Sequence, residues 1–185
     1  MIGLILLLGL GAAAVGAAGV VATATLVGIA PQAPCGSTVD AAGAPVLAAA
    51  GCVTVLRATY TDASQTAAAT IGIAVLRSPG DAVRAQSTFV AGRGGLLALG
   101  FPGTVASLFT GSARETYAGK ITAGRYLFLY AAGYTDGRQT TLQVNSDGGY
   151  TGETVTTDLG NGVVSQLSAE FQAPARPCAD KNVRC

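Results

Sequence analysis

The sequence lacks histidine and tryptophan, and charged side chains are scarce. Without histidine, the chain has neither the commonest general base nor the commonest nitrogen ligand for metals. The 11 basic and 10 acidic residues give a formal net charge of +1, so charge gives no reason to expect a nucleic-acid partner. Only 11% of the residues are charged, against roughly 25% in soluble domains.

The N-terminus accounts for part of this deficit. Residues 2–30 contain no ionisable side chain, and Pro31 follows them. Because a helix needs roughly 20 residues to cross the hydrocarbon core, we expect residues 1–30 to form a transmembrane helix that contacts membrane lipid through residues 2–30. Two alternatives stay open. Ala22 and Ala24 match the small-residue pattern of a signal-peptide cleavage site, which predicts a secreted protein, and the segment could be a buried soluble helix.

Four cysteines follow the apolar segment. An even number of cysteines outside a membrane segment is typical of disulfides in an oxidising compartment. Three pairings remain open, and the long gaps do not match the close C-x-x-C pairs of zinc sites, so we expect neither a metal nor a cofactor. No lysine or arginine follows the segment closely, which favours a C-terminal domain outside the cytoplasm. The cysteines are Cys35, Cys52, Cys178 and Cys185.

The remaining residues divide into three parts. Residues 31–51 contain prolines and many alanines, and we expect a linker and an arm. Residues 52–174 are long enough for one domain with a core. Residues 175–185 form a cysteine-bearing tail.

Periodicity predicts both strands and helices within this domain. Alternating β-branched residues favour a hairpin of residues 52–61 and 66–76. Ser78, Pro79 and Asp81 match a helix start, and residues 96–99 suggest a short strand. Residues 104–122 are ambiguous between strand and helix. Residues 125–135 are apolar on both faces, as in a covered strand, and a spacing of four predicts a helix through Leu159, Val163, Leu167 and Phe171.

A short echo suggests a repeated unit. Residues 58–65 and 132–139 share an Ala-x-Tyr-Thr-Asp-x-x-Gln pattern, and each follows a strand-rich stretch. Coincidence in a biased composition is the alternative explanation. A repeat would give two ββα units. We therefore predict an α+β fold in which an antiparallel sheet carries helices on one face, preceded by the transmembrane helix.

Two groups of residues are candidates for a site. Tyr126, Tyr130 and Tyr134 share one face of a strand and could stack on a ligand, although packing in a tryptophan-free core is the favoured interpretation. Asp62 and Asp136 could be brought together as the carboxylate pair of a hydrolase. Aspartate is also an ordinary turn residue, which favours a structural role, and we identify no catalytic residue.

The chain resembles uncharacterised membrane-anchored envelope proteins of high-GC actinobacteria. The resemblance rests on the Ala/Gly-rich N-terminus, the preference for arginine over lysine, the position of Cys35, and residues 57–62 and 132–138. It implies a cell-envelope location and no known activity. We therefore expect a membrane-anchored, extracytoplasmic binding or scaffold domain that is not an enzyme and has a membrane-protein partner. A ligand-sensing module and a hydrolase are the alternatives.

Overall fold

The structure is a computed structural model that describes residues 23–89, 95–111, 115–138, 143–144, 150–151 and 154–172. Its strands are β1 (Thr25–Ile29), β2 (Thr54–Thr61), β3 (Ala67–Val75), β4 (Glu115–Ala123), β5 (Tyr126–Tyr134), β6 (Gln143–Val144) and β7 (Tyr150–Thr151). Its helices are α1 (Gly43–Ala49), α2 (Pro79–Thr88) and α3 (Thr154–Gln172), with a 3-10 turn, η2, at Cys35–Ser37.

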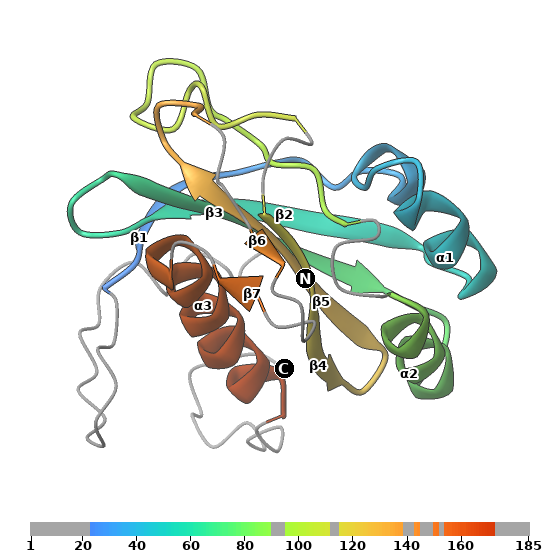
Figure 1. Ribbon diagram of the computed structural model, residues 1–185. Coiled ribbons are helices and arrows are strands. Elements are labelled where there is room, and N and C mark those ends of the chain that lie inside the picture. The colour runs from blue at the N-terminus through green and yellow to red at the C-terminus, as the bar shows by residue number, and fades with distance from the viewer. Residues whose placement is uncertain are drawn as a thin grey trace, which may run out of the picture.

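Five of the strands form one antiparallel sheet (Figure 1). Their order is β1-β2-β3-β5-β4, and β6 pairs with β7 in a separate two-stranded ribbon. The predicted hairpin is confirmed, because β2 and β3 pair in register from Thr54–Val75 to Thr61–Ala68. The strand predicted at residues 125–135 is confirmed as β5, which is paired on both edges. The α+β class is therefore correct.

The sheet is buried on both faces. One core cluster contains Leu47 of α1, Ala82 of α2 and Leu127 of β5. The other contains Phe128 of β5 and Leu159 of α3. The prediction that the helices lie on one face is wrong: α1 and α2 pack on one side, and α3 packs on the other. The physical reason is that β5 is apolar at successive positions, so each of its faces needs a cover.

The repeated ββα order is present, but the echo does not mark equivalent positions. A hairpin precedes a helix in β2-β3-α2, and β4-β5 is followed by the small ribbon and then by α3. Tyr60 lies at the end of the first strand of its hairpin, whereas Tyr134 ends the second strand. The helices α2 and α3 also lie on opposite faces. The two units are therefore not related by a simple symmetry.

The sheet begins earlier than the sequence suggested. Residues 25–29 form the edge strand β1, which pairs with β2 from Thr25–Thr61 to Ile29–Ala58. The transmembrane helix expected over residues 2–30 therefore cannot extend through residues 25–29. No helix in the part of the chain that the structure describes is long and apolar enough to span a membrane. Residues 1–22 lie outside the described residues.

Several other segments also differ from expectation. Residues 96–99 form isolated bridges, Val39–Leu96 and Ala98–Gly111, in place of a strand. Part of the ambiguous stretch 104–122 falls in strand β4, and turns precede it. The arm 31–51 contains η2 and α1 and contributes Val39 and Leu47 to the core. The predicted C-terminal helix is confirmed as α3, which begins earlier, at Thr154.

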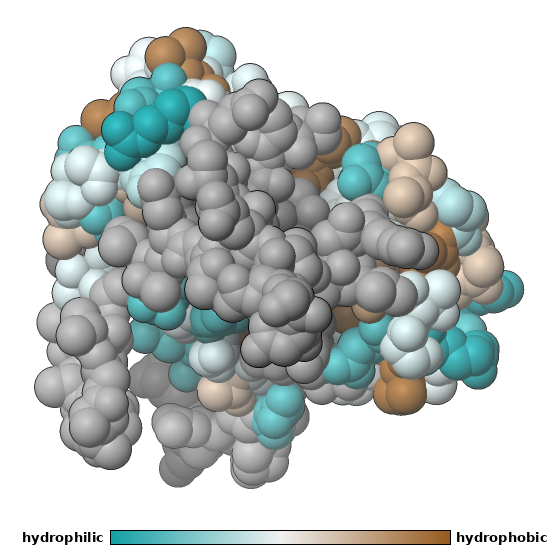
Figure 2. Space-filling view, in the orientation of Figure 1, coloured by the Kyte–Doolittle hydropathy of each residue, from teal (hydrophilic) through white to brown (hydrophobic). Residues whose placement is uncertain are grey.

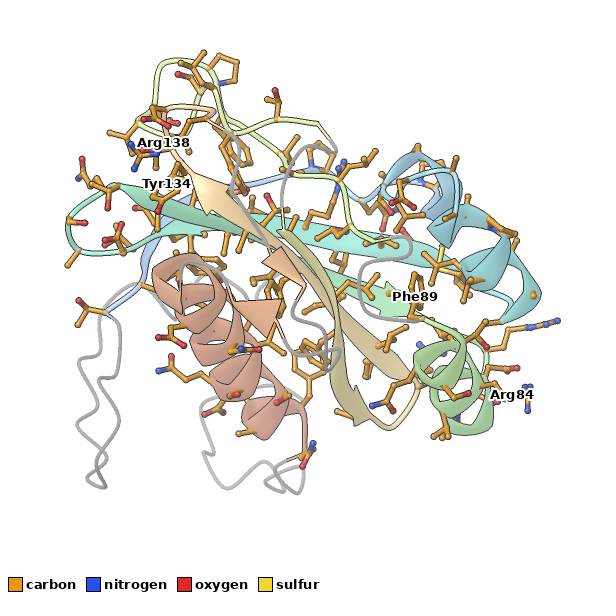
Figure 3. The ribbon with its side chains drawn as sticks, viewed as in Figure 1. Arg84, Phe89, Tyr134 and Arg138 are labelled. Carbon is orange, nitrogen blue, oxygen red and sulfur yellow. A yellow bond between two sulfur atoms is a disulfide. The ribbon has the colours of Figure 1, made fainter. Side chains whose placement is uncertain are left out.

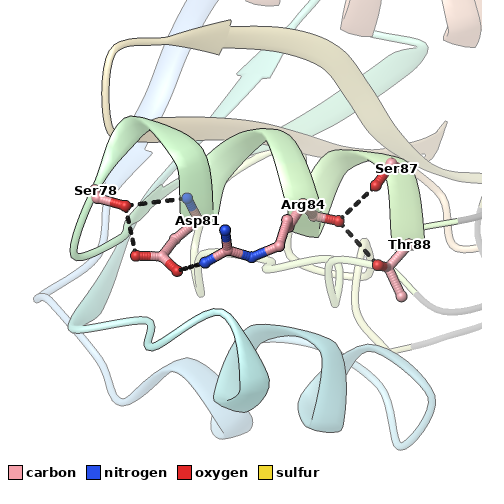
Figure 4. Close-up of polar contacts among 5 residues, drawn as sticks. All are labelled: Ser78, Asp81, Arg84, Ser87 and Thr88. Carbon is pink, nitrogen blue, oxygen red and sulfur yellow. Dashed lines mark hydrogen bonds and ion pairs between the residues drawn. The ribbon is translucent and has the colours of Figure 1, made fainter.

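The start of α2 is fixed by a cap (Figure 4). The Ser78 hydroxyl accepts a 3.1 Å hydrogen bond from the backbone N–H of Asp81 and donates a 2.7 Å hydrogen bond to its carboxylate. Arg84 also pairs with this carboxylate. The hydrogen bond from Ser78 is the largest cause that holds the pKa of Asp81 below its ordinary value. Desolvation acts in the opposite direction, and the positive charges of Arg84 and Arg77 lower the pKa further. The helix start predicted at Ser78 is confirmed.

Replacing Ser78 with alanine tests this cap. Ser78→Ala leaves the Asp81 N–H without its acceptor, and we expect the free energy of unfolding to fall by about 1 kcal/mol. Urea denaturation of both proteins measures the change. Ser87→Ala is the matched control, because Ser87 is an exposed serine at the other end of α2 that donates to the Arg84 carbonyl oxygen. Equal effects of the two substitutions would contradict the capping role.

Candidate functional site

Tyr130 lies under helix α3. Its side chain is 1% exposed, and its hydroxyl donates a 3.1 Å hydrogen bond to Oδ1 of Asn161 on α3. A Cβ atom at Gly160 would come within 2.5 Å of the Tyr130 ring, so the glycine allows the helix to approach the strand closely. A ligand cannot reach this ring while α3 is in place.

The two other tyrosines of this face have different surroundings. Tyr126 is half-buried and packs edge-to-face against Phe171, with ring centroids 5.0 Å apart. Tyr134 lies at the other end of β5, where the Arg138 guanidinium lies 3.7 Å from the centre of its ring. Figure 3 shows Tyr134 and Arg138 together at one end of the sheet. The three rings therefore do not form one open stacking surface, and their contacts agree with the packing interpretation.

The two predicted carboxylates lie in turns that touch each other. The backbone N–H of Thr135 donates a 3.0 Å hydrogen bond to the carbonyl oxygen of Thr66. The Thr135 hydroxyl donates to the carbonyl oxygen of Gln65 at 2.9 Å. The β2–β3 turn and the end of β5 are therefore joined at one end of the sheet, because β3 and β5 are antiparallel neighbours in register from Ala67–Tyr134.

Asp62 is occupied by its own turn. Its carboxylate accepts backbone hydrogen bonds from Ser64, Thr66 and Ala67 at 3.3, 2.9 and 2.9 Å, and a further one from the Ser64 hydroxyl. Partial burial acts to raise the pKa of Asp62, but these hydrogen bonds outweigh it and lower that pKa below its ordinary value. A carboxylate held in its ionised form is poorly suited to be the general acid of a hydrolase.

Asp136 is occupied in a similar way. Its carboxylate accepts a 3.1 Å hydrogen bond from the backbone N–H of Arg138 and lies 3.5 Å from the guanidinium of the same residue. Because Arg138 also covers the Tyr134 ring, these three side chains form a local cluster at the end of β5. Each aspartate thus has the contacts of a turn residue, which agrees with the structural interpretation of both.

Arg57 is a candidate that the sequence did not single out. It lies on β2 between Val55 and Thr59, on the face that packs under residues 95–111. Its Nε atom is buried and has no hydrogen-bond partner among the residues that the structure describes. Burial lowers the pKa of the guanidinium below its ordinary value, yet an arginine stays protonated in proteins. A partly desolvated guanidinium whose buried Nε–H has no partner among the described residues is a suitable donor for an anion.

The pattern around Arg57 could have revealed it. Val55, Arg57 and Thr59 alternate with Leu56 and Ala58, so a two-residue period puts Arg57 on the same face as Val55. What the period does not show is the cover over that face. A Cβ at the paired residue Gly72 would come within 2.6 Å of the Leu96 side chain, which places residues 95–111 directly above the strand.

One disulfide lies at the entrance to the domain. Cys35 and Cys52 are bonded, with their Cα atoms 6.2 Å apart, and they join η2 to the start of β2 across α1. Closing a loop of this length stabilises the folded state by about 3 kcal/mol in the entropy model. Cys178 and Cys185 lie outside the described residues. Of the three pairings left open by the sequence, the structure therefore selects the one that links Cys35 to Cys52.

The described residues contain no group of three or more histidine, cysteine, aspartate or glutamate side chains able to hold a metal ion. Comparison with other proteins adds no assignment: neither a family model, nor a curated protein, nor a solved structure matches the chain.

The electrostatics of Asp62 give a testable pH dependence. A carboxyl group whose pKa is lowered by folding stabilises the protein above its unfolded pKa, about 3.9, and this contribution is lost as the pH falls through the lower, folded value. We expect Asp62→Asn to lower the free energy of unfolding by about 1 kcal/mol at pH 7. The difference from the wild type should shrink as the pH drops below about 4.

Denaturant unfolding across a pH series measures this difference. Asp136→Asn is the control, because Asp136 is in an exposed turn and accepts one backbone hydrogen bond from Arg138. A constant difference between Asp62→Asn and the wild type at every pH would contradict the electrostatic explanation.

Proposed function

We propose that this chain is a membrane-anchored, extracytoplasmic binding or scaffold domain without catalytic activity, acting as an accessory component of a membrane complex. The Cys35–Cys52 disulfide is the observation on which the proposal depends. Disulfides persist in oxidising compartments and are rare where thiols are kept reduced. The charge-free residues 2–22 supply the anchor, and at 21 residues they still have the length of a membrane-crossing helix.

The two alternative functions lose support. The ligand-sensing alternative needs Tyr126, Tyr130 and Tyr134 on one accessible surface, and Tyr130 is buried under α3. The hydrolase alternative needs a raised pKa on one carboxyl, and that of Asp62 is lowered. The scaffold proposal requires neither condition. It needs only a stable domain, and a sheet buried on both faces provides one.

Fractionation of cells that produce the full chain tests the proposed membrane location. We expect the full chain in the membrane fraction and a variant that begins at Thr23 outside it, because the variant keeps strand β1 but lacks the apolar segment. A maleimide reagent applied before and after reduction should label Cys35 and Cys52 only after reduction. Recovery of the full chain in the cytosolic fraction, with both thiols labelled before reduction, would overturn the proposal.

A search for a partner should use the same truncated variant, which begins at Thr23. Detergent extracts of the full chain and of the variant that begins at Thr23 should be compared by pull-down. A variant that lacks residues 1–30 is unsuitable, because it has lost β1 and exposes the edge of β2. A partner recovered reproducibly with the full chain alone would place the contact on the apolar segment. A partner recovered with both proteins would place it on the domain.

Arg57 supports a second candidate function, the binding of a small anion to the domain. The supporting observation is its buried Nε atom, which lacks a hydrogen-bond partner among the described residues. We expect inorganic phosphate to raise the thermal unfolding midpoint of the wild type by about 2 °C or more, since a ligand that binds only the folded state stabilises it. Arg57→Met should lose this response.

Arg84→Met is the matched control, because Arg84 is exposed and already paired with Asp81. It should keep the response to phosphate. An equal shift in the wild type and in Arg57→Met would show that phosphate acts through general salt effects, and would remove this second function.

A further inference from the structure

The domain begins almost at the end of the apolar segment. Ala24 already packs against the core cluster beneath α3, and Thr25 pairs with Thr61. Only Thr23 stands between residue 22 and the first packed side chain, and an extended residue spans at most about 3.5 Å. If residues 2–22 cross the membrane, strand β1 must therefore start within about 10 Å of the lipid.

Strand β1 presents two large apolar side chains on one face. Leu26 pairs with Tyr60 and Ile29 pairs with Ala58, and both partners lie on the same face of β2. A bulge between Leu26 and Gly28 puts Leu26 and Ile29 on one face although they are three residues apart. Leu26 is 39% exposed and Ile29 is 41% exposed. Exposed apolar residues that gather on one face mark a contact surface.

Helix α3 does not cover this part of the sheet. It packs across β3, β4 and β5, whereas β1 is the edge strand and pairs with β2. On the opposite side of β1, the Phe101 ring lies against Gly28. The segment 101–110 that follows exposes Val105 and Leu108, and Figure 2 shows apolar atoms at the top of the view over this segment. The segment that contacts β1 through Phe101 thus also has exposed apolar side chains.

The chemistry of this edge suits a lipid surface. Residues 23–39 contain no aspartate, glutamate, lysine or arginine, so no charge of this segment needs to be desolvated. Tyr60, opposite Leu26, is half-buried, and tyrosine is enriched at the boundary between membrane and water. Among the described residues, β1 pairs with β2 alone, and backbone N–H and C=O groups without partners are not tolerated in the hydrocarbon core. The headgroup region contains water that can bond to these backbone groups, and it also accommodates the apolar and tyrosine side chains of this edge.

We propose that strand β1 lies flat on the bilayer surface, with Leu26 and Ile29 in the headgroup region and the sheet standing on this edge. The inference rests on the proposed function, because it requires the retained anchor. It goes further in fixing the orientation of the domain: α2 packs against β4 and β5, at the edge of the sheet opposite β1, and therefore lies away from the lipid.

The absence of tryptophan makes a direct test practical. Single tryptophans are introduced into the full chain, which is reconstituted in phosphatidylcholine vesicles with nitroxide-labelled lipid. The label is placed either near the headgroups or deep in the acyl chains. We expect Leu26→Trp and Ile29→Trp to lose about half of their fluorescence to the shallow label and less to the deep one. Val83→Trp is the control, because Val83 is an exposed apolar residue on α2.

Thr23→Trp separates the inference from the function on which it rests. Quenching of Thr23→Trp without quenching of Ile29→Trp would mean that the anchor holds while the strand stands away from the lipid, and would overturn the inference alone. No quenching of Thr23→Trp would overturn the proposed anchor itself. A blue-shifted emission of Leu26→Trp and Ile29→Trp without lipid quenching would indicate that a second copy covers the edge, and would also overturn the inference.

Discussion

Burial of the central sheet on both faces is the constraint on which the rest of the structure depends. Residues Leu127 and Leu129 of β5 face one core cluster, and Phe128 and Tyr130 face the other. Apolar surface on two sides must be removed from water on two sides. The chain therefore places α1, α2 and residues 95–111 against one face and α3 against the other. The small residues Gly72 and Gly160 let these covers approach the strands closely.

This arrangement explains why the candidate site residues have structural roles. A tyrosine on a covered strand is consumed by packing, as Tyr130 is, and only the rings at the two ends of β5 keep some exposure. The aspartates lie where strands end, and turn backbones there have N–H groups that need acceptors. Arg57 differs, because it is a charged side chain on a covered face whose Nε atom has no partner among the described residues.

The disulfide, helix α1 and strand β1 together form the N-terminal part of the domain. The Cys35–Cys52 bond links η2 to the start of β2, with helix α1 between them. Strand β1 follows the apolar segment with almost no intervening chain. If residues 2–22 anchor the domain as proposed, the lack of a flexible linker leaves it fewer orientations relative to the membrane than a long linker would. Within the described residues, β1 is paired along one edge alone, and an edge strand of this kind needs protection from pairing with other chains.

Local signals in the sequence determined much of this protein. The two-residue period of residues 52–61 and 66–76 predicted the hairpin. Ser78 predicted the start of α2, and the spacing from Leu159 to Phe171 predicted α3, because each of these elements depends on near neighbours in the chain. Tertiary structure alone decided which faces the helices cover, the Cys35–Cys52 pairing, and the strand conformation of residues 25–29. An apolar, Thr- and Val-containing stretch has the same composition in a membrane helix and at a sheet edge, and only the partner strand β2 distinguishes them.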